Sequence, residues 1–266
     1  MIPQACKARL YKPHVTTSEP LPLIIFVHGG GFFAGNLDTE DYTCRNLCSD
    51  TLSLVLSLEY QTGWTLPISH SIDDCYNATL WAHSHASTCG ADPKKIVIVG
   101  GFAGAAIATA TIYKLVQNGH GDKIAGFVSM NGLHCHPEAV PPAYSHLMNS
   151  YTTNSGTLLF VSGHHTLLRY EVLDMQPPNT DYSLFPAAGG PDYLRGFPRT
   201  FILTSENDAS RDDGTVFEAE LRDAGVQTKL YCFKGLAHYF WHFPLKQAGE
   251  EFRQKLVEGV RWTLGR

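Results

Sequence analysis

The stretch IVIVGGFAGAAIATA, residues 96–110, decides the fold. Its β-branched start is typical of a buried strand, two glycines then break the run, and the alanine-rich part after Gly104 is typical of a helix. The sequence therefore predicts a strand, a sharp turn and a helix in close contact. Such a turn usually presents a nucleophile at its apex. The apex residue here is Phe102, whose phenyl ring cannot attack an electrophile, so the turn predicts an active-site architecture without its usual reacting atom.

Strand-like and helix-like segments alternate along most of the chain. We expect strands at 8–11, 23–27, 52–58, 95–99, 126–130, 200–204 and 228–233, and helices near 39–50, 71–86, 103–117, 211–224 and 245–263. This alternation predicts an α/β fold with a mostly parallel central sheet and helices on both faces. A length of 266 residues suits one domain, residues 1–266.

One region interrupts the alternation. Residues 134–195 are rich in Pro, Tyr, Ser, Asn and His and lie between two clear strand segments. An insertion of this length above a parallel sheet is usually functional. We therefore predict an inserted lid or cap within the single domain.

The composition narrows the classes of partner. The net charge is −5, and the sequence holds no Lys/Arg-rich run, so neither nucleic acid nor an anionic membrane surface is an expected partner. The first residues, MIPQACKARLYKP, hold no apolar core of signal-peptide length, and no segment of the sequence approaches the length of a membrane span. The seven cysteines are scattered and odd in number, which favours reduced thiols. We expect a cytoplasmic protein that acts on small molecules, with its oligomeric state, monomer or homodimer, left open.

A glycine-rich motif follows the second expected strand. It reads FVHGGGFFAGN, residues 26–36. Consecutive glycines let the backbone approach a ligand and leave amide N–H groups free to bind one oxygen, as in an oxyanion hole. A flexible turn is the alternative interpretation.

Two polar residues near the C-terminus form the third motif. Asp208 follows one expected strand and His238 follows the next, with a helix between them. This order and placement are typical of the acid and base of a catalytic triad. Taken singly, Asp208 could cap a helix and His238 could be structural.

Together the motifs resemble the hormone-sensitive-lipase-like branch of the α/β-hydrolase fold. That branch carries HGGG(F/W), a GDSAGG elbow, an acid loop like DPLRDE and a final HxF loop, which correspond to residues 28–32, 100–105, 208–213 and 238–240. The resemblance implies a triad acid and base at Asp208 and His238, and oxyanion amides at Gly30, Gly31 and Ala103. The chain also differs from the family motif at three positions. Phe102 is found where the family has its serine nucleophile, Gly101 where it has the neighbouring aspartate, and Ala105 where it has the second glycine of the GG pair.

A base and an oxyanion hole without a nucleophile can still remove a proton next to a carbonyl or drive an elimination. We therefore predict a non-hydrolytic enzyme, namely a cyclase, isomerase or dehydratase/lyase, with Phe102 as a flat wall of the pocket. Aromatic residues in the neighbouring segments favour an apolar substrate, with core packing as the alternative for each: Phe32, Phe33, Trp64, Tyr239, Phe240 and Trp241.

Two other functions stay open at this point. One is a small-molecule receptor, as the gibberellin receptors are in this branch. The other is a weak esterase in which His238 activates water directly. The histidine-containing segments 134–136 and 164–165 could indicate a metal, but their spacing fits no site of the family, and we expect neither a metal nor a cofactor.

Overall fold

A single mixed sheet forms the centre of the molecule. The computed structural model describes residues 6–62, 67–135, 137–156, 182–183 and 185–266. Its strands run in the order β1-β3-β2-β4-β5-β6-β7, with β1 antiparallel to β3 and every other neighbouring pair parallel. The strands are β1 Lys7–Tyr11, β2 Leu21–Val27, β3 Leu54–Glu59, β4 Ala91–Gly101, β5 Gly126–Met130, β6 Arg199–Asn207 and β7 Thr228–Ala237. The predicted mostly parallel sheet is confirmed.

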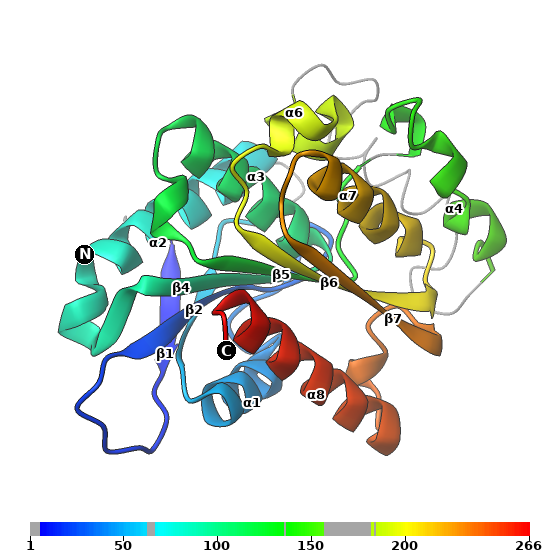
Figure 1. Ribbon diagram of the computed structural model, residues 1–266. Coiled ribbons are helices and arrows are strands. Elements are labelled where there is room, and N and C mark those ends of the chain that lie inside the picture. Colours follow the sequence, from blue (N-terminus) through cyan, green and yellow to red (C-terminus); the bar gives the residue numbers. More distant parts are fainter. Residues whose placement is uncertain (1–5, 63–66, 136, 157–181, 184) are drawn as a thin grey trace.

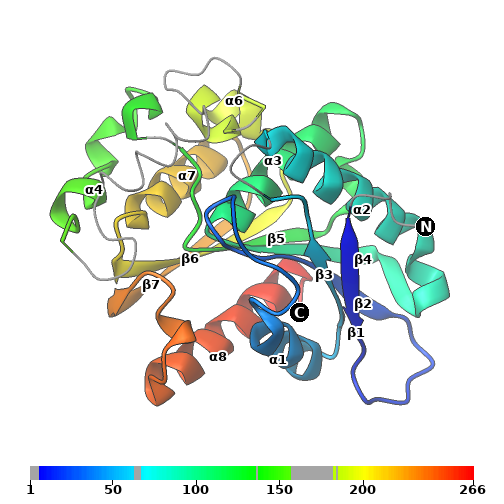
Figure 2. The ribbon, with the colours of Figure 1, turned by 180° about the vertical axis from the view of Figure 1, so that it is seen from behind.

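Helices cover both faces of the sheet. One face carries α1 Asp41–Thr51 and α8 Lys246–Thr263, and the other carries α2 Ile68–Cys89, α3 Ala103–Gln117 and α7 Arg211–Asp223 (Figure 1). The same two layers are seen from behind in Figure 2. All five predicted helices are confirmed, although α2 begins and ends three residues beyond the expected range on each side.

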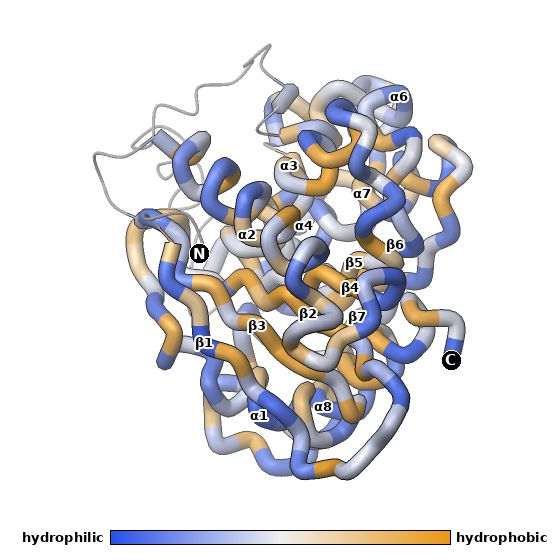
Figure 3. The backbone as a smooth tube through the Cα atoms, turned by 90° about the vertical axis from the view of Figure 1, so that its left-hand side faces the viewer, coloured by the Kyte–Doolittle hydropathy of each residue, from blue (hydrophilic) through white to orange (hydrophobic). Residues whose placement is uncertain are grey.

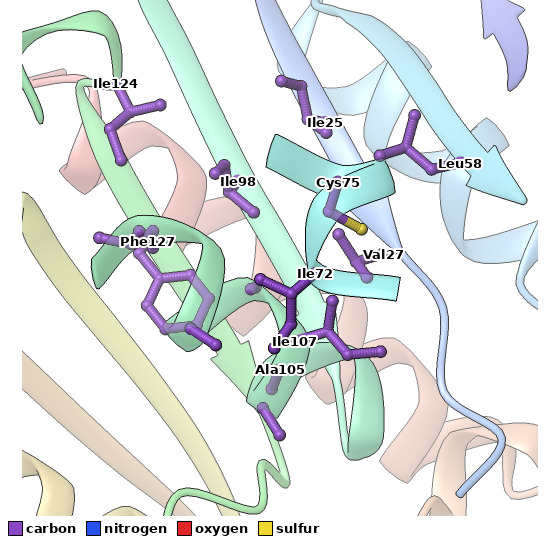
Figure 4. Packing of buried hydrophobic residues seen from close by; sticks show 14 of the residues in the cluster. Ile25, Val27, Leu58, Ile72, Cys75, Ile98, Ala105, Ile107, Ile124 and Phe127 are labelled. Carbon is purple, nitrogen blue, oxygen red and sulfur yellow. The ribbon is translucent and has the colours of Figure 1, made fainter. Parts of the chain in front are cut away.

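Alternation of side chains along β2 divides the core between these layers. Ile25 and Val27 belong to the cluster under α2 and α3, whereas Ile24 and Phe26 belong to the cluster under α1 and α8. Successive side chains of a strand point to opposite faces of the sheet, so the apolar segment that forms β2 contributes side chains to both clusters. Figure 3 shows the resulting hydrophobic centre, and Figure 4 shows Ile72 among the side chains that pack on the α2/α3 face. Each such side chain contributes about 1.5–3 kcal/mol on burial.

The third strand begins later than expected. The prediction of a strand from Leu52 is wrong at that residue, which caps the C-terminus of α1 in the left-handed conformation with φ 50° and is 48% exposed. Its amide bonds back to the Cys48 carbonyl, which closes the last turn of the helix. Strand β3 therefore begins only at Leu54.

The described part of the inserted region packs on the start of α7. Helix α4, Ser150–Thr153, lies there, and α6, Pro191–Leu194, packs on another part of α7 (Figure 1). The backbone amides of Asn149 and Ser150 donate to Asp212 Oδ2 at 2.9 and 2.7 Å. Residues 157–181 and 184 lie outside the described residues, so the role of 134–195 as a lid stays a prediction.

Helix α7 also buries an acidic side chain. Glu220 is fully buried, and neither of its carboxyl oxygens has a hydrogen-bond partner within the described part of the chain. Burial, with a smaller contribution from Asp223, raises the pKa of the Glu220 carboxyl to about 9. The side chain is therefore neutral in the folded protein at neutral pH.

We expect Glu220→Gln to stabilise the fold increasingly as the pH rises. The unfolded chain releases the Glu220 proton near pH 4.5, whereas the folded chain keeps it up to about pH 9, so wild-type stability falls across this window. At pH 8 the variant should gain about 1–3 kcal/mol in the free energy of unfolding, measured in urea. Glu258→Gln, at an exposed position of α8, is the control. A gain that does not grow with pH would contradict the assignment.

Candidate active site

The residues expected to act together lie at one edge of the sheet. The glycine-rich loop follows β2, Phe102 follows β4, Asp208 follows β6 and His238 follows β7. These are the carboxyl ends of parallel strands, where open α/β sheets bind their ligands. The order of the strands thus brings four segments from distant parts of the sequence to one place.

Asp208 and His238 form the predicted pair. His238 Nδ1 lies 2.6 Å from Asp208 Oδ2, and each residue is only 3% exposed. The second carboxyl oxygen, Asp208 Oδ1, accepts hydrogen bonds from the amide and hydroxyl of Ser210 at 2.9 and 3.0 Å. Burial opposes ionisation of Asp208, but the charge of His238 and these hydrogen bonds outweigh it and lower the pKa of the carboxyl. Because His238 Nδ1 is hydrogen-bonded to Asp208, His238 Nε2 is the nitrogen that would exchange a proton with a substrate.

Asn131 is a member of this group that the sequence analysis missed. It follows β5 with φ 44°, and its Nδ2 donates to Asp208 Oδ2 at 2.6 Å. The signal was a polar residue directly after a strand that ends at the same edge as β6. A single Asn after a strand is common in turns, and only the pairing of β5 with β6 places it beside Asp208.

The turn after β4 has the backbone geometry of a nucleophile elbow. Phe102 has φ 49° and ψ −111°, and its amide donates to the Met130 carbonyl at 2.9 Å. This region costs a non-glycine residue about 1–3 kcal/mol. The turn has therefore kept its strained shape although the side chain at its apex offers no nucleophilic atom.

The Phe102 ring lies directly against the base. The ring centroids of Phe102 and His238 are 4.4 Å apart at an interplanar angle of 74°, an edge-to-face contact. Phe102 is 3% exposed. The ring and the imidazole thus share one buried space rather than face each other across an open pocket.

Close contact between α3 and β2 depends on Gly104. A Cβ atom at this position would overlap the carbonyl oxygens of Val27 and His28. Glycine therefore lets the first turn of α3 lie against the start of the glycine-rich loop, as a nucleophile elbow requires.

The glycine-rich loop is held by a stacked pair of rings. The Tyr60 hydroxyl donates to the His28 carbonyl at 2.7 Å, and the two rings stack at 4.4 Å. His28 Nδ1 in turn donates to the Gly29 carbonyl at 2.7 Å, and burial lowers the pKa of the imidazole, so the ring is neutral. Beyond it, Gly30 and Gly31 have φ values of 134° and 62°.

The oxyanion role predicted for Gly30, Gly31 and Ala103 stays a prediction. Ala103 is fully buried and begins α3, where amide groups are not yet used by the helix. Such amides carry the positive end of the helix dipole, which suits an oxyanion. The backbone geometry of both segments is therefore compatible with the role.

The predicted aromatic rim divides into two groups. Phe32 is 4% exposed and belongs to the same apolar cluster as Phe102, with Tyr239 packed against that cluster. Trp64 lies outside the described residues. The substrate contacts expected of Phe32, Trp64 and Tyr239 stay predictions.

Phe240 and Trp241 pack toward the layer of α1 and α8. The Trp241 ring stacks flat on Phe252 of α8, with centroids 4.1 Å apart, and also contacts the Tyr239 ring at 4.4 Å. Phe240 packs on Phe252 as well, at 5.9 Å. Phe240 is therefore core, which was the alternative for these rings, and Trp241 packs against the same apolar cluster under α1 and α8.

His134 has a structural environment. Its ring stacks on Phe217 at 4.0 Å and its Nε2 lies 2.8 Å from the Ser129 hydroxyl, while burial lowers its pKa to about 3. His136, His164 and His165 lie outside the described residues. Among the described residues, no three His, Cys, Asp or Glu side chains gather as metal ligands would, and no helix is both long and apolar enough to cross a bilayer.

A family model for the alpha/beta hydrolase fold matches residues 24–242. The chain belongs to this family. It is 30% identical to the versiconal hemiacetal acetate esterase of Dothistroma septosporum, over 97% of this chain and 78% of that protein. Among solved structures, a vibralactone cyclase superposes with a TM-score of 0.88 at 25% identity, over 98% of this chain and 76% of the other.

A further solved structure has the same fold. A brefeldin A esterase, described as a bacterial homologue of human hormone-sensitive lipase, superposes with a TM-score of 0.85 over 97% of this chain and 73% of the other. At 23% identity this likeness concerns the fold alone. Esterase names also predominate among the curated relatives of similar identity.

Proposed function

We propose that this α/β hydrolase catalyses a cyclisation, isomerisation or elimination on an apolar intermediate of specialised metabolism, without a covalent acyl-enzyme. The observation that carries the proposal is the contact between an intact His238–Asp208 pair and a phenyl ring at the elbow apex. The pair is buried and hydrogen-bonded at 2.6 Å, and the apex side chain is 4.4 Å from the imidazole, ring to ring. We infer that Phe102 replaces the nucleophile while the base is kept.

The reaction would use the base directly. His238 Nε2 takes a proton from the carbon next to a carbonyl, and the negative charge passes to the carbonyl oxygen, where the amides of Gly30, Gly31 and Ala103 stabilise it. Returning the proton to another carbon completes an isomerisation. Expelling a leaving group that the same imidazolium protonates completes an elimination. In a ring closure the enolate carbon attacks a second carbonyl carbon of the same molecule, the π bond of that carbonyl breaks, and its oxygen takes the proton back from the imidazolium.

The relatives agree with this class of substrate. The name of the Dothistroma esterase specifies a hemiacetal acetate, and that of the structural neighbour a lactone cyclase. Both names describe transformations of oxygenated carbon skeletons on this fold. The predominance of esterases among the relatives is consistent with a dyad inherited from hydrolysis.

A binding protein is the second candidate, and one observation favours it. Phe102 and His238 are in contact and each is 3% exposed, so a ligand would need the ring to move before it could reach the imidazole. A receptor has no need of such access. It also has no need of the Asp208 hydrogen bonds, which is why we place catalysis first.

Mass spectrometry separates the candidates. We expect the purified protein, incubated with a panel of apolar keto esters, hemiacetals and lactone precursors, to give products of unchanged mass or of mass lowered by one leaving group. A product that gains water and splits would indicate hydrolysis instead. Recovery of unchanged compound bound to the protein, with no product across the panel, would overturn the proposal in favour of a receptor.

A further inference from the structure

The Tyr239 hydroxyl lies between two segments of backbone. A Cβ atom built at Gly29, in the glycine-rich loop, would overlap this hydroxyl oxygen, and so would one built at Gly101, the residue before Phe102. The phenol therefore passes between the loop after β2 and the turn after β4, and contacts both where only glycine leaves room.

Tyr239 also connects these two segments to the base. It follows His238 in the chain, has a left-handed backbone with φ 54°, and its ring stacks on the imidazole with centroids 4.9 Å apart. Its ring centroid lies 6.4 Å from that of Phe102. One side chain thus touches the loop, the elbow and the segment that carries His238.

The hydroxyl is buried near an acidic side chain. Burial, assisted by the negative charge of the buried Glu40, raises the pKa of the phenol well above its usual range, so the group is neutral. Phenylalanine would fill the ring position but would lack the oxygen atom that lies between Gly29 and Gly101.

We propose that Tyr239 is a positioning residue whose phenol braces the glycine-rich loop against the elbow turn. The spacing that it fixes is the spacing between the amides of Gly30 and Gly31 on one side and Ala103 on the other. In this respect the inference rests on the proposed function, which gives those amides their role. The interlock of Tyr239 with Gly101 itself rests on the packing of the phenol against the glycine and can be tested without a substrate.

Four variants test the interlock through thermal stability. Gly101 lies in a strand with no left-handed φ, so Gly101→Ala adds the overlap with the phenol and a close contact of 3.2 Å with the flexible end of Met130, and we expect the Tm to fall by about 3–10 °C. Adding Tyr239→Phe removes the overlapping oxygen and leaves the ring carbon Cζ 3.2 Å from the new Cβ, so most of the loss should be recovered. At Gly29 the same ring carbon lies at 2.9 Å, so Tyr239→Phe should rescue Gly29→Ala much less.

Gly249→Ala is the matched control. This glycine of α8 has no atom within 4 Å of its added Cβ, so the same substitution should not lower the Tm there. If Gly101→Ala behaved like Gly249→Ala, or if Tyr239→Phe did not rescue it, the interlock would be disproved.

Amide hydrogen exchange in Tyr239→Phe tests the brace itself. Loss of the hydroxyl should accelerate exchange at Gly30, Gly31 and Ala103 by about tenfold, with the central residues of α8 unchanged. The low-field proton resonance of His238 Nδ1–H should persist, which shows that the dyad is still formed. Unchanged exchange at the three amides would overturn the brace, whatever the outcome of the substrate panel.

Discussion

His238→Ala should lower the rate of product formation by about 10²–10⁴-fold, the usual contribution of a positioned acid–base group. The imidazole contacts the Phe102 ring and is hydrogen-bonded to Asp208, so it is the group placed to act as acid or base on a substrate beside that ring. Its removal leaves the pocket wall and the backbone amides in place. Initial rates on the compound identified by mass spectrometry, at saturating concentration, give the measurement.

The control for this loss is an exposed histidine. His70→Ala, on α2, should keep the wild-type rate. A His238→Ala protein that folds normally and turns over at the wild-type rate would show that the base is a relic, and that any reaction depends on the shape of the pocket alone. The two outcomes differ by orders of magnitude, so the experiment separates acid–base catalysis from templating.

Motifs predicted the parts of this site that are local in the sequence. The turn at 96–110 was identified because strand and helix propensities meet at glycines, and Asp208 and His238 because each follows a strand. Strand order then brings them together by the general rule for parallel sheets. The central sheet and the pairing of Asp208 with His238, both predicted from the sequence, are therefore confirmed in the structure.

Contacts between residues that are far apart in the sequence could not be predicted from it. Nothing near Gly101 indicates that its missing side chain leaves room for the hydroxyl of Tyr239, because the two meet only once β4 and β7 have ended at the same edge. For the same reason Trp241 was assigned to the pocket, although it stacks on Phe252 of α8. Tyr239 and Trp241 are in contact, with ring centroids 4.4 Å apart, yet they pack against different apolar clusters, and composition alone does not separate the two environments.

Phe102→Ser should raise esterase activity well above that of the wild-type protein. The apex keeps the strained backbone of a nucleophile elbow, with φ 49°, and its side chain already contacts the imidazole of His238. A serine hydroxyl there would find a base oriented by Asp208 and, as proposed, an oxyanion hole at Gly30, Gly31 and Ala103. We expect cleavage of p-nitrophenyl acetate to rise by about 10²-fold, well below a natural triad because the pocket evolved around a ring.

The informative control is Phe102→Ala, which opens the same space without adding a nucleophile. If serine and alanine raise ester cleavage equally, the gain comes from water that His238 activates, and no acyl-enzyme should be seen by mass spectrometry of the quenched protein. If only serine raises it, and an acetylated protein appears, the elbow is intact in geometry and the wild-type chain departs from hydrolysis at one side chain. If neither variant gains activity while both keep their fold, the amides cannot be serving as an oxyanion hole, and the mechanism proposed for Gly30, Gly31 and Ala103 would have to be abandoned.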